Sequence, residues 1–278
     1  MASFTIPKRF DPLRGPFDRV KDADPLLMSA AIAYNFFFAL VPLAIAAVAA
    51  LTLLGRSEAG LANLELFLAD VFPEEVSAFI SDILIEATDI VGESQGPIIA
   101  ISLLVAIYAG SRGIYAVQKA LRQIQRVGED RPYWRVRGLG IVFTLGAGVA
   151  LIAGYIVVLF SQFFAEFLRR YGLDLGSLTG ISSGVVAVWI IALLWAIYRL
   201  GPPVPFERSL ISAMIATAII VVMTAAAALV IPAFGSNTLA ALGAVGVVLI
   251  WLYAVGFVVI VVPAFISPAE AIIRRKSA

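Results

Sequence analysis

The longest uncharged stretch of the chain, residues 209–269, most limits what the chain can fold into. No Asp, Glu, Lys or Arg interrupts this run. A helix needs about 20 mostly apolar residues to cross a bilayer, so the run is long enough for two spans. Pro232, Gly235, Ser236 and Asn237 would supply the turn between them, which predicts spans at residues 209–231 and 239–262.

Four further apolar runs predict the remaining spans, at residues 28–54, 94–111, 138–165 and 175–198. Across the whole chain 61% of residues are hydrophobic and only 14% are charged, with a mean hydropathy of +0.98. A soluble domain averages about 25% charged residues, so the composition independently requires an apolar solvent. The sequence therefore predicts an all-α, polytopic membrane protein with about six transmembrane helices.

Charge on either side of the short run at residues 94–111 sets the predicted orientation. The segment before it is acidic, the segment after it is basic, and Lys and Arg residues are retained in the cytoplasm. If both termini are cytoplasmic, only Arg56, Arg169 and Arg170 among the 20 Lys and Arg residues fall outside. We therefore expect the N-terminus and the C-terminus to lie in the cytoplasm.

These expectations divide the chain into three parts. Residues 1–27 form a cytoplasmic interfacial segment, residues 28–265 form the six-helix transmembrane domain, and residues 266–278 form a cytoplasmic tail. Within the domain, residues 112–138 are expected to be a basic cytoplasmic loop, and residues 55–96 an outer, periplasmic helical segment.

The outer segment contains a predicted amphipathic helix that begins near Pro73. A proline suits the first helical position, and Glu74 and Glu75 suit the first turn, where the helix dipole favours anions. Apolar residues then recur at helical spacing, namely Val76, Phe79, Ile80, Ile83, Ala87 and Ile90. The acidic face of this helix is interpreted as solvated, and a vestibule that gathers cations or solutes is the alternative.

Two absences limit the chemistry. The chain contains no cysteine and no histidine, which removes the commonest zinc ligands and the commonest general base. No phosphate-binding loop, dinucleotide-binding glycine motif or nucleophile elbow is present, and the predicted spans hold no acidic residue at their centres. We therefore expect no enzyme activity, no cofactor and no metal site.

Polar residues in the first span form one candidate site. Tyr34 and Asn35 lie in its first third, and Pro42 lies near its middle, where a proline leaves a backbone carbonyl without its helical partner. These residues are interpreted either as contacts between helices or, together with Tyr253 of the last span, as the lining of a cavity.

A second candidate site is basic. Arg112, Lys119 and Arg122 recur at near-helical spacing after the second span, and Arg131 and Arg135 follow. Such residues fit either ordinary retention of positive charge or contact with an anionic headgroup or solute. The expected partners are the lipid bilayer and anionic headgroups on its cytoplasmic side, with a homo-oligomer allowed by the glycine-rich third span. Nucleic acid is not expected, because aromatic residues scarcely interleave with the basic ones.

Four motifs carry a resemblance to a known family. They are SAAIAYNFFFALVPL at residues 29–43, KALRQIQRVGEDRPYWRVR at 119–137, YRLGPPVPF at 198–206 and LGAVGVVLIWLYAVGF at 242–257. In this order they resemble the YihY/BrkB family of bacterial inner-membrane proteins along nearly the full chain. Arg122 stands where the family usually has Asn, and residues 261–266 lack the carboxylate that often ends its last span.

The resemblance implies a multi-pass protein of the bacterial inner membrane with a role in transport or in the cell envelope. Some members have been labelled ribonucleases, but this chain has no His, Cys or acidic cluster that could hold catalytic metals. We expect a permease or exporter of a small or amphiphilic, lipid-related solute. The alternative is a non-transporting scaffold or envelope-assembly factor.

Overall fold

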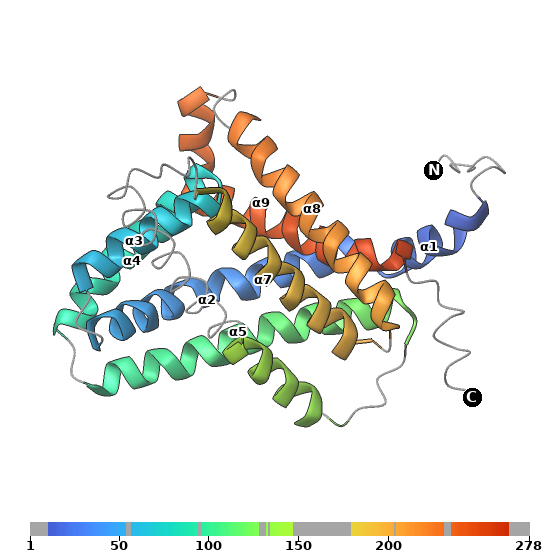
Figure 1. The fold of residues 1–278 in the computed structure, drawn as a ribbon, viewed down its shortest axis with the longest axis horizontal. Coiled ribbons are helices and arrows are strands. Elements are labelled where there is room, and N and C mark those ends of the chain that lie inside the picture. The colour runs from blue at the N-terminus through green and yellow to red at the C-terminus, as the bar shows by residue number, and fades with distance from the viewer. Residues whose placement is uncertain are drawn as a thin grey trace, which may run out of the picture.

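The computed structural model describes residues 11–53, 57–93, 96–127, 132, 134–146, 179–202, 204–230 and 235–266. This part of the chain consists of helices and short connections, without a strand. The helices are α1 (Asp11–Asp22), α2 (Pro25–Leu53), α3 (Ser57–Val71), α4 (Glu74–Glu93), α5 (Gly96–Ile124), α7 (Thr179–Leu200), α8 (Phe206–Val230) and α9 (Gly235–Ile266) (Figure 1). Residues 134–146 are helical as well. The all-α prediction is confirmed.

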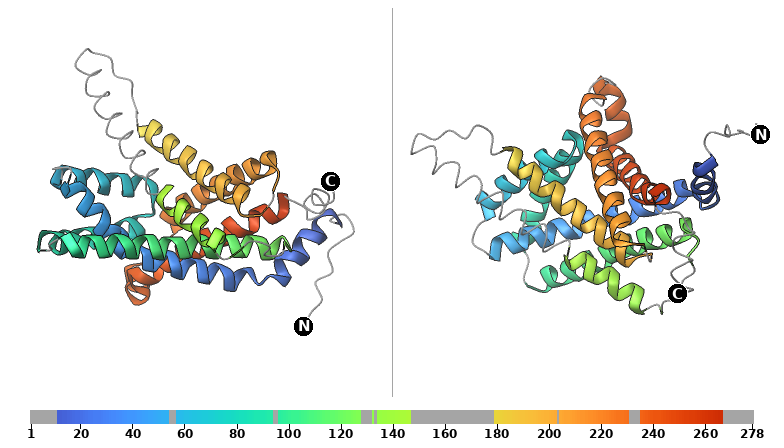
Figure 2. Two further views of the ribbon diagram at one scale, coloured as in Figure 1. Left: turned by 90° about the horizontal axis from the view of Figure 1, so that it is seen from below. Right: turned by 45° about the vertical axis from the view of Figure 1, so that its right-hand side comes forward.

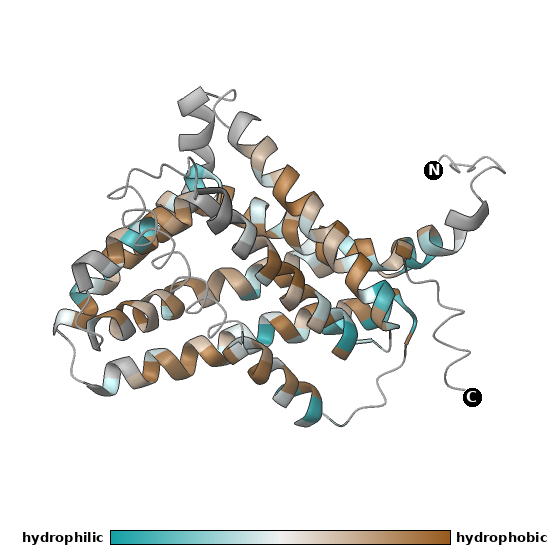
Figure 3. Cartoon of the chain, viewed as in Figure 1, coloured by the Kyte–Doolittle hydropathy of each residue, from teal (hydrophilic) through white to brown (hydrophobic). Residues whose placement is uncertain are grey.

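Several of these helices are long and apolar enough to cross a membrane. The candidate spans are Pro25–Ala49 of α2, Ala100–Ile124 of α5, Phe206–Ala227 of α8 and Val245–Ile266 of α9. α7 contains a shorter apolar stretch, Ala187–Leu200. Apolar residues colour long stretches of α2, α5 and α8, whereas polar residues gather where α1, the end of α5 and the start of α8 meet (Figure 3). Most of the predicted third span, residues 138–165, lies outside the described residues.

α2 and α5 lie side by side along the length of the bundle, and α9 packs against both (Figures 1 and 2). Glycines allow these close contacts. A Cβ on Gly113 of α5 would lie 3.1 Å from the ring of Phe36, and one on Gly256 of α9 would lie 3.2 Å from Cγ2 of Ile32. Buried apolar side chains from α2, α5, α7, α8 and α9 fill one core, including Ile32, Leu121, Ile197, Ala213 and Ile260.

α5 is longer than the predicted second span. A loop was expected at residues 112–138, but the helix continues to Ile124, and residues 134–146 form another helix. The physical reason is that Ile114, Leu121 and Ile124 belong to a buried face that continues past the first basic residue. Arg112 and Lys119 therefore lie on exposed sides of one continuous helix and not in a loop.

The segment after α2 folds into two helices. The helix predicted to begin near Pro73 is confirmed as α4, while α3 was not expected. α4 packs against α2 through a second apolar cluster, in which Leu84, Ala87 and Val91 of α4 meet Ala44 and Val48 of α2. The acidic side of α4 faces outward, since Asp82, Glu86 and Asp89 are exposed.

A proline near the end of α9 breaks its hydrogen-bond ladder. Pro263 has no N–H, so the carbonyl of Val259 loses its helical donor. The hydroxyl of Tyr198, from α7, donates to that carbonyl over 2.8 Å. Tyr198 is 1% exposed, so its hydroxyl replaces the missing N–H inside the core.

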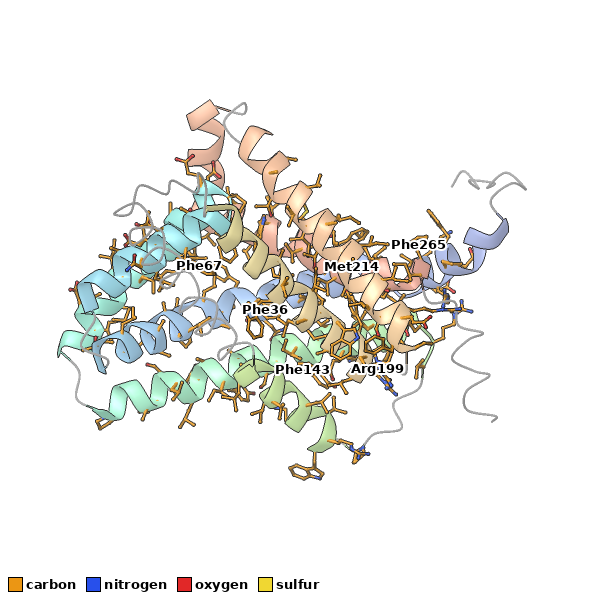
Figure 4. The ribbon with its side chains drawn as sticks, viewed as in Figure 1. Phe36, Phe67, Phe143, Arg199, Met214 and Phe265 are labelled. Atoms are coloured by element: carbon orange, nitrogen blue, oxygen red, sulfur yellow. The ribbon has the colours of Figure 1, made fainter. Side chains whose placement is uncertain are left out.

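α1 binds to the same end of α9. The guanidinium of Arg19 is buried and donates to the backbone oxygen of Ala264 over 2.8 Å. Phe17 packs edge-on against Phe265, and Figure 4 shows Phe265 near the end of α9. Burial lowers the pKa of Arg19, and the nearby positive charge of Arg126 lowers it further. We call this end of the bundle, where α1, α5, α7, α8 and α9 meet, the α1 end.

α9 is not one continuous helix. Gly243 adopts φ 67° and ψ 157°, a conformation that residues with a Cβ rarely adopt. The turn predicted at residues 232–237 lies partly outside the described residues, and Gly235, Ser236 and Asn237 belong to the first part of α9. The junction between α8, which ends at Val230, and α9, which begins at Gly235, overlaps the predicted turn, and Gly243 adds a second break inside α9.

Candidate functional site

A row of polar side chains is buried on α5 near the α1 end. Gln118, Arg122 and Gln125 are 2%, 6% and 2% exposed. Gln125 directly follows α5, but its N–H still donates to the backbone oxygen of Leu121 over 3.1 Å, so the spacing of four and three residues places the three side chains on one face. The same stretch also carries buried apolar residues, so the row is set into the core and does not face water. We call these three residues the α5 polar row.

The connection between α7 and α8 lies against this row. Arg122 Nη1 donates to the backbone oxygen of Gly201 over 3.2 Å. A Cβ on Gly201 would lie 2.8 Å from the oxygen of Ile197 and 3.6 Å from Cγ of Gln118. A side chain at residue 201 would therefore collide with the end of α7, and its Cβ would be in ordinary contact with Gln118.

The glutamines carry polar atoms without a hydrogen-bond partner among the described residues. These atoms are Nε2 of Gln118 and both Nε2 and Oε1 of Gln125. Buried polar groups in native proteins are nearly always hydrogen-bonded, either to protein atoms or to bound water. The α5 polar row therefore offers two donors and an acceptor, beside a guanidinium, to a bound polar molecule.

The two candidate sites predicted from the sequence fall on different parts of the bundle. Of the basic set, Arg122 is buried, whereas Arg112, Lys119 and Arg135 are exposed. Arg112 lies beside Tyr108 and shares that ring with Arg137. Arg131 lies outside the described residues.

The predicted cavity residues lie on α2 and α9, which pack against each other. Tyr34 is 60% exposed and its ring lies 4.6 Å from that of Phe38. Asn35 Nδ2 donates to the oxygen of Ala31 over 2.7 Å, which satisfies it within its own helix. Pro42 and Tyr253 are half-buried. A cavity lined by these residues stays a prediction.

A cavity of about 530 Å³ lies between α3 and α4. It is lined by Ala62, Glu65, Leu66, Ala69, Glu74, Ser77, Ala78 and Ser81. The exposed lining is mostly apolar, and two carboxylates and two hydroxyls add polar groups to it. None of Asp82, Glu86 and Asp89 lines this cavity, so the vestibule on the acidic side of α4 stays a prediction.

Four residues that sequence reasoning missed take part in these arrangements. Gln118 and Gln125 were overlooked because residues 112–138 were interpreted as a loop, where glutamines need no explanation. Their spacing with Arg122, amid apolar residues, was the signal that could have revealed them. Tyr108 and Arg137 were overlooked because nothing in the sequence shows that residues 134–146 cross α5 at that point.

Comparison with known protein families gives a match over most of the chain. A family model described as virulence factor BrkB matches residues 17–266, which is most of the chain. No curated protein and no solved structure matches the chain.

Proposed function

Because the chain belongs to the BrkB family of membrane proteins, we propose that it is a permease or exporter of a small or amphiphilic solute, with a lipid-related molecule as the first candidate. The observation that carries this proposal is the α5 polar row. Polar and ionisable side chains are costly inside a membrane, and where they occur they often mark the path of a substrate or ion. Gln118 and Arg122 lie within the candidate span Ala100–Ile124.

Energetics support a functional interpretation of the row. Each buried polar group without a partner costs about 1–3 kcal/mol. An apolar side chain at either glutamine would avoid this cost, so stability alone does not explain the pair. A solute that passes between α5 and the α7–α8 connection would hydrogen-bond to them during its passage.

Movement of a fluorescent lipid in liposomes tests the proposal. We expect the purified protein to speed the exchange of NBD-labelled phosphatidylglycerol between leaflets, measured by bleaching with dithionite. Gln118→Leu combined with Gln125→Leu should return exchange to the rate of protein-free liposomes, because the polar groups of the row are lost. Gln123→Leu is the matched control, since Gln123 is exposed on the same helix.

Two results would contradict this reading. If the double variant folds and moves the lipid like the unmodified protein, the α5 polar row is not the path. If the unmodified protein exchanges the lipid no faster than protein-free liposomes do, the proposal of a lipid-related solute fails. The non-transporting scaffold is then favoured.

We also propose six spans, location in the bacterial inner membrane, cytoplasmic termini and contact with anionic headgroups on the cytoplasmic side. The absence of cysteine allows a direct test, because a single introduced thiol is unique. In intact spheroplasts, a membrane-impermeant maleimide should label Glu86→Cys on α4 but not Glu207→Cys at the start of α8. Both residues are exposed, so accessibility alone does not separate them. The reverse labelling pattern would overturn the orientation.

A further inference from the structure

Two arginines converge on one tyrosine where the helix at residues 134–146 crosses α5 (Figure 1). The guanidinium carbon of Arg137 lies 4.7 Å from the ring centroid of Tyr108, and that of Arg112 lies 6.0 Å from it. Arg112 Nη1 also donates to the hydroxyl of Tyr108 over 3.4 Å. We call Tyr108, Arg112 and Arg137 the arginine–tyrosine cluster.

Close helix packing fixes the position of this cluster. A Cβ on Gly140 would lie 2.9 Å from the backbone oxygen of Ser111, and one on Gly110 would lie 2.7 Å from Cγ2 of Thr144. Ser111 is fully buried at the contact. The two arginines are therefore held near each other by the backbone and not only by flexible side chains, which lowers the entropy cost of binding one ligand with both.

The cluster faces outward from a membrane helix. Tyr108 is 55% exposed and Arg112 is exposed, and both lie within the candidate span Ala100–Ile124. Among the described residues, no carboxylate pairs with Arg112 or Arg137. A charged side chain on the lipid side of a span is costly unless an opposite charge reaches it. The site thus favours an anion that is delivered from the membrane.

Exposed apolar side chains border the cluster on both helices. They are Leu104 and Val105 on α5, and Ile141, Val142 and Leu145 on the crossing helix. Such a border fits the acyl chains of a lipid, whereas a free phosphate ion would gain nothing from it. Two guanidiniums supply paired N–H donors whose geometry suits a phosphate group.

We propose that the arginine–tyrosine cluster binds the phosphate of an anionic phospholipid, whose acyl chains lie along the apolar residues beside it. The proposal rests on the proposed function for the amphiphilic solute and for contact with anionic headgroups, and it adds the residues that hold the phosphate. Binding itself needs no transport, so the two proposals can fail separately.

Lipid binding measured by native mass spectrometry tests this site. The protein is purified in detergent and titrated with phosphatidylglycerol, and with phosphatidylcholine as the zwitterionic reference. Arg112→Gln combined with Arg137→Gln should weaken phosphatidylglycerol binding at least tenfold, because hydrogen bonds to two charged groups are lost. Binding of phosphatidylcholine should change far less.

A control with the same change in charge distinguishes a specific lipid-binding site from attraction by the overall charge of the protein. Lys21→Gln combined with Arg126→Gln removes two exposed positive charges that lie outside the predicted headgroup site. We expect this pair to retain most of the phosphatidylglycerol binding. Equal losses in the two double variants would overturn the proposal, because attraction by overall charge would then explain the binding.

Two further outcomes would also overturn it. Displacement of phosphatidylglycerol by millimolar inorganic phosphate would show that the ligand is a phosphate group without a lipid. A change from dimer to monomer in the Arg112 and Arg137 variant would show that a second copy of the chain covers the cluster. The Gln118 and Gln125 variant should bind the lipid normally, so loss of lipid movement with intact binding would count against the α5 polar row alone.

Discussion

Tyr198→Phe is expected to lower the free energy of unfolding by about 1–3 kcal/mol, the usual cost of leaving a buried polar group without its partner. The change removes only the hydroxyl that donates to Val259 over 2.8 Å. The usual helical donor to that carbonyl is missing, because Pro263 stands four residues later. Unfolding of the detergent-solubilised protein by SDS titration measures the loss, and a thermal melt provides an independent check.

A double-mutant cycle tests the cause. Adding Pro263→Ala to Tyr198→Phe restores an N–H to the helix and should recover most of the lost stability. Tyr115→Phe on α5 is the matched control, because that hydroxyl makes no hydrogen bond to another described residue. If Pro263→Ala changes the free energy of unfolding equally in the Tyr198→Phe and Tyr115→Phe backgrounds, Tyr198 and Pro263 act independently. The proposed replacement of the missing N–H is then refuted.

Gly140→Leu is expected to lower the free energy of unfolding by a comparable or larger amount, at the point where the helix at residues 134–146 crosses α5. A Cβ at residue 140 would lie 2.9 Å from the backbone oxygen of Ser111, so the crossing helix must move away from α5. Overpacking of this kind costs about 1–3 kcal/mol. The displacement should also separate Arg137 from Tyr108, so phosphatidylglycerol binding should fall together with stability.

Gly138→Leu is the control for this prediction, because a Cβ at residue 138 meets nothing within 4 Å. Replacing a helical glycine there should be neutral or favourable, by up to about 1 kcal/mol. If both substitutions reduce stability and lipid binding equally, the close crossing seen at Gly140 does not hold the arginine–tyrosine cluster together.

The large-scale architecture was predictable because a bilayer imposes simple demands on sequence. Long apolar runs had to become helices, and α2, α8 and α9 fall on the runs that predicted them. Pro73 and the apolar spacing after it located α4. The same logic failed at α5, because charge was used to end the span at residue 111. Charged residues can end an apolar run without ending the helix that contains it, and here Leu121 and Ile124 keep one face of the helix buried.

The candidate sites were less predictable because they depend on contacts between distant segments. The sequence around Tyr198 does not indicate that its hydroxyl donates to the carbonyl of Val259. The sequence around Tyr108 does not indicate that Arg137 lies above its ring. Conversely, Asn35 looked functional in the sequence but satisfies its amide on Ala31 in its own helix. Hydropathy predicts which residues enter the membrane, whereas their partners follow from how the helices cross.

The break at Gly243 has a consequence for how the last helix fits its membrane. A straight helix over the 32 residues of α9 would be about 48 Å long, well beyond the ~30 Å hydrocarbon thickness of a bilayer. The candidate span begins at Val245, just after the break, and the 22 residues from there to Ile266 measure about 33 Å. The break at Gly243 thus leaves a continuous apolar helix that matches the thickness of the bilayer. A bulkier residue there would disfavour the break, and the longer straight helix would have to tilt or the bilayer would have to thicken around it.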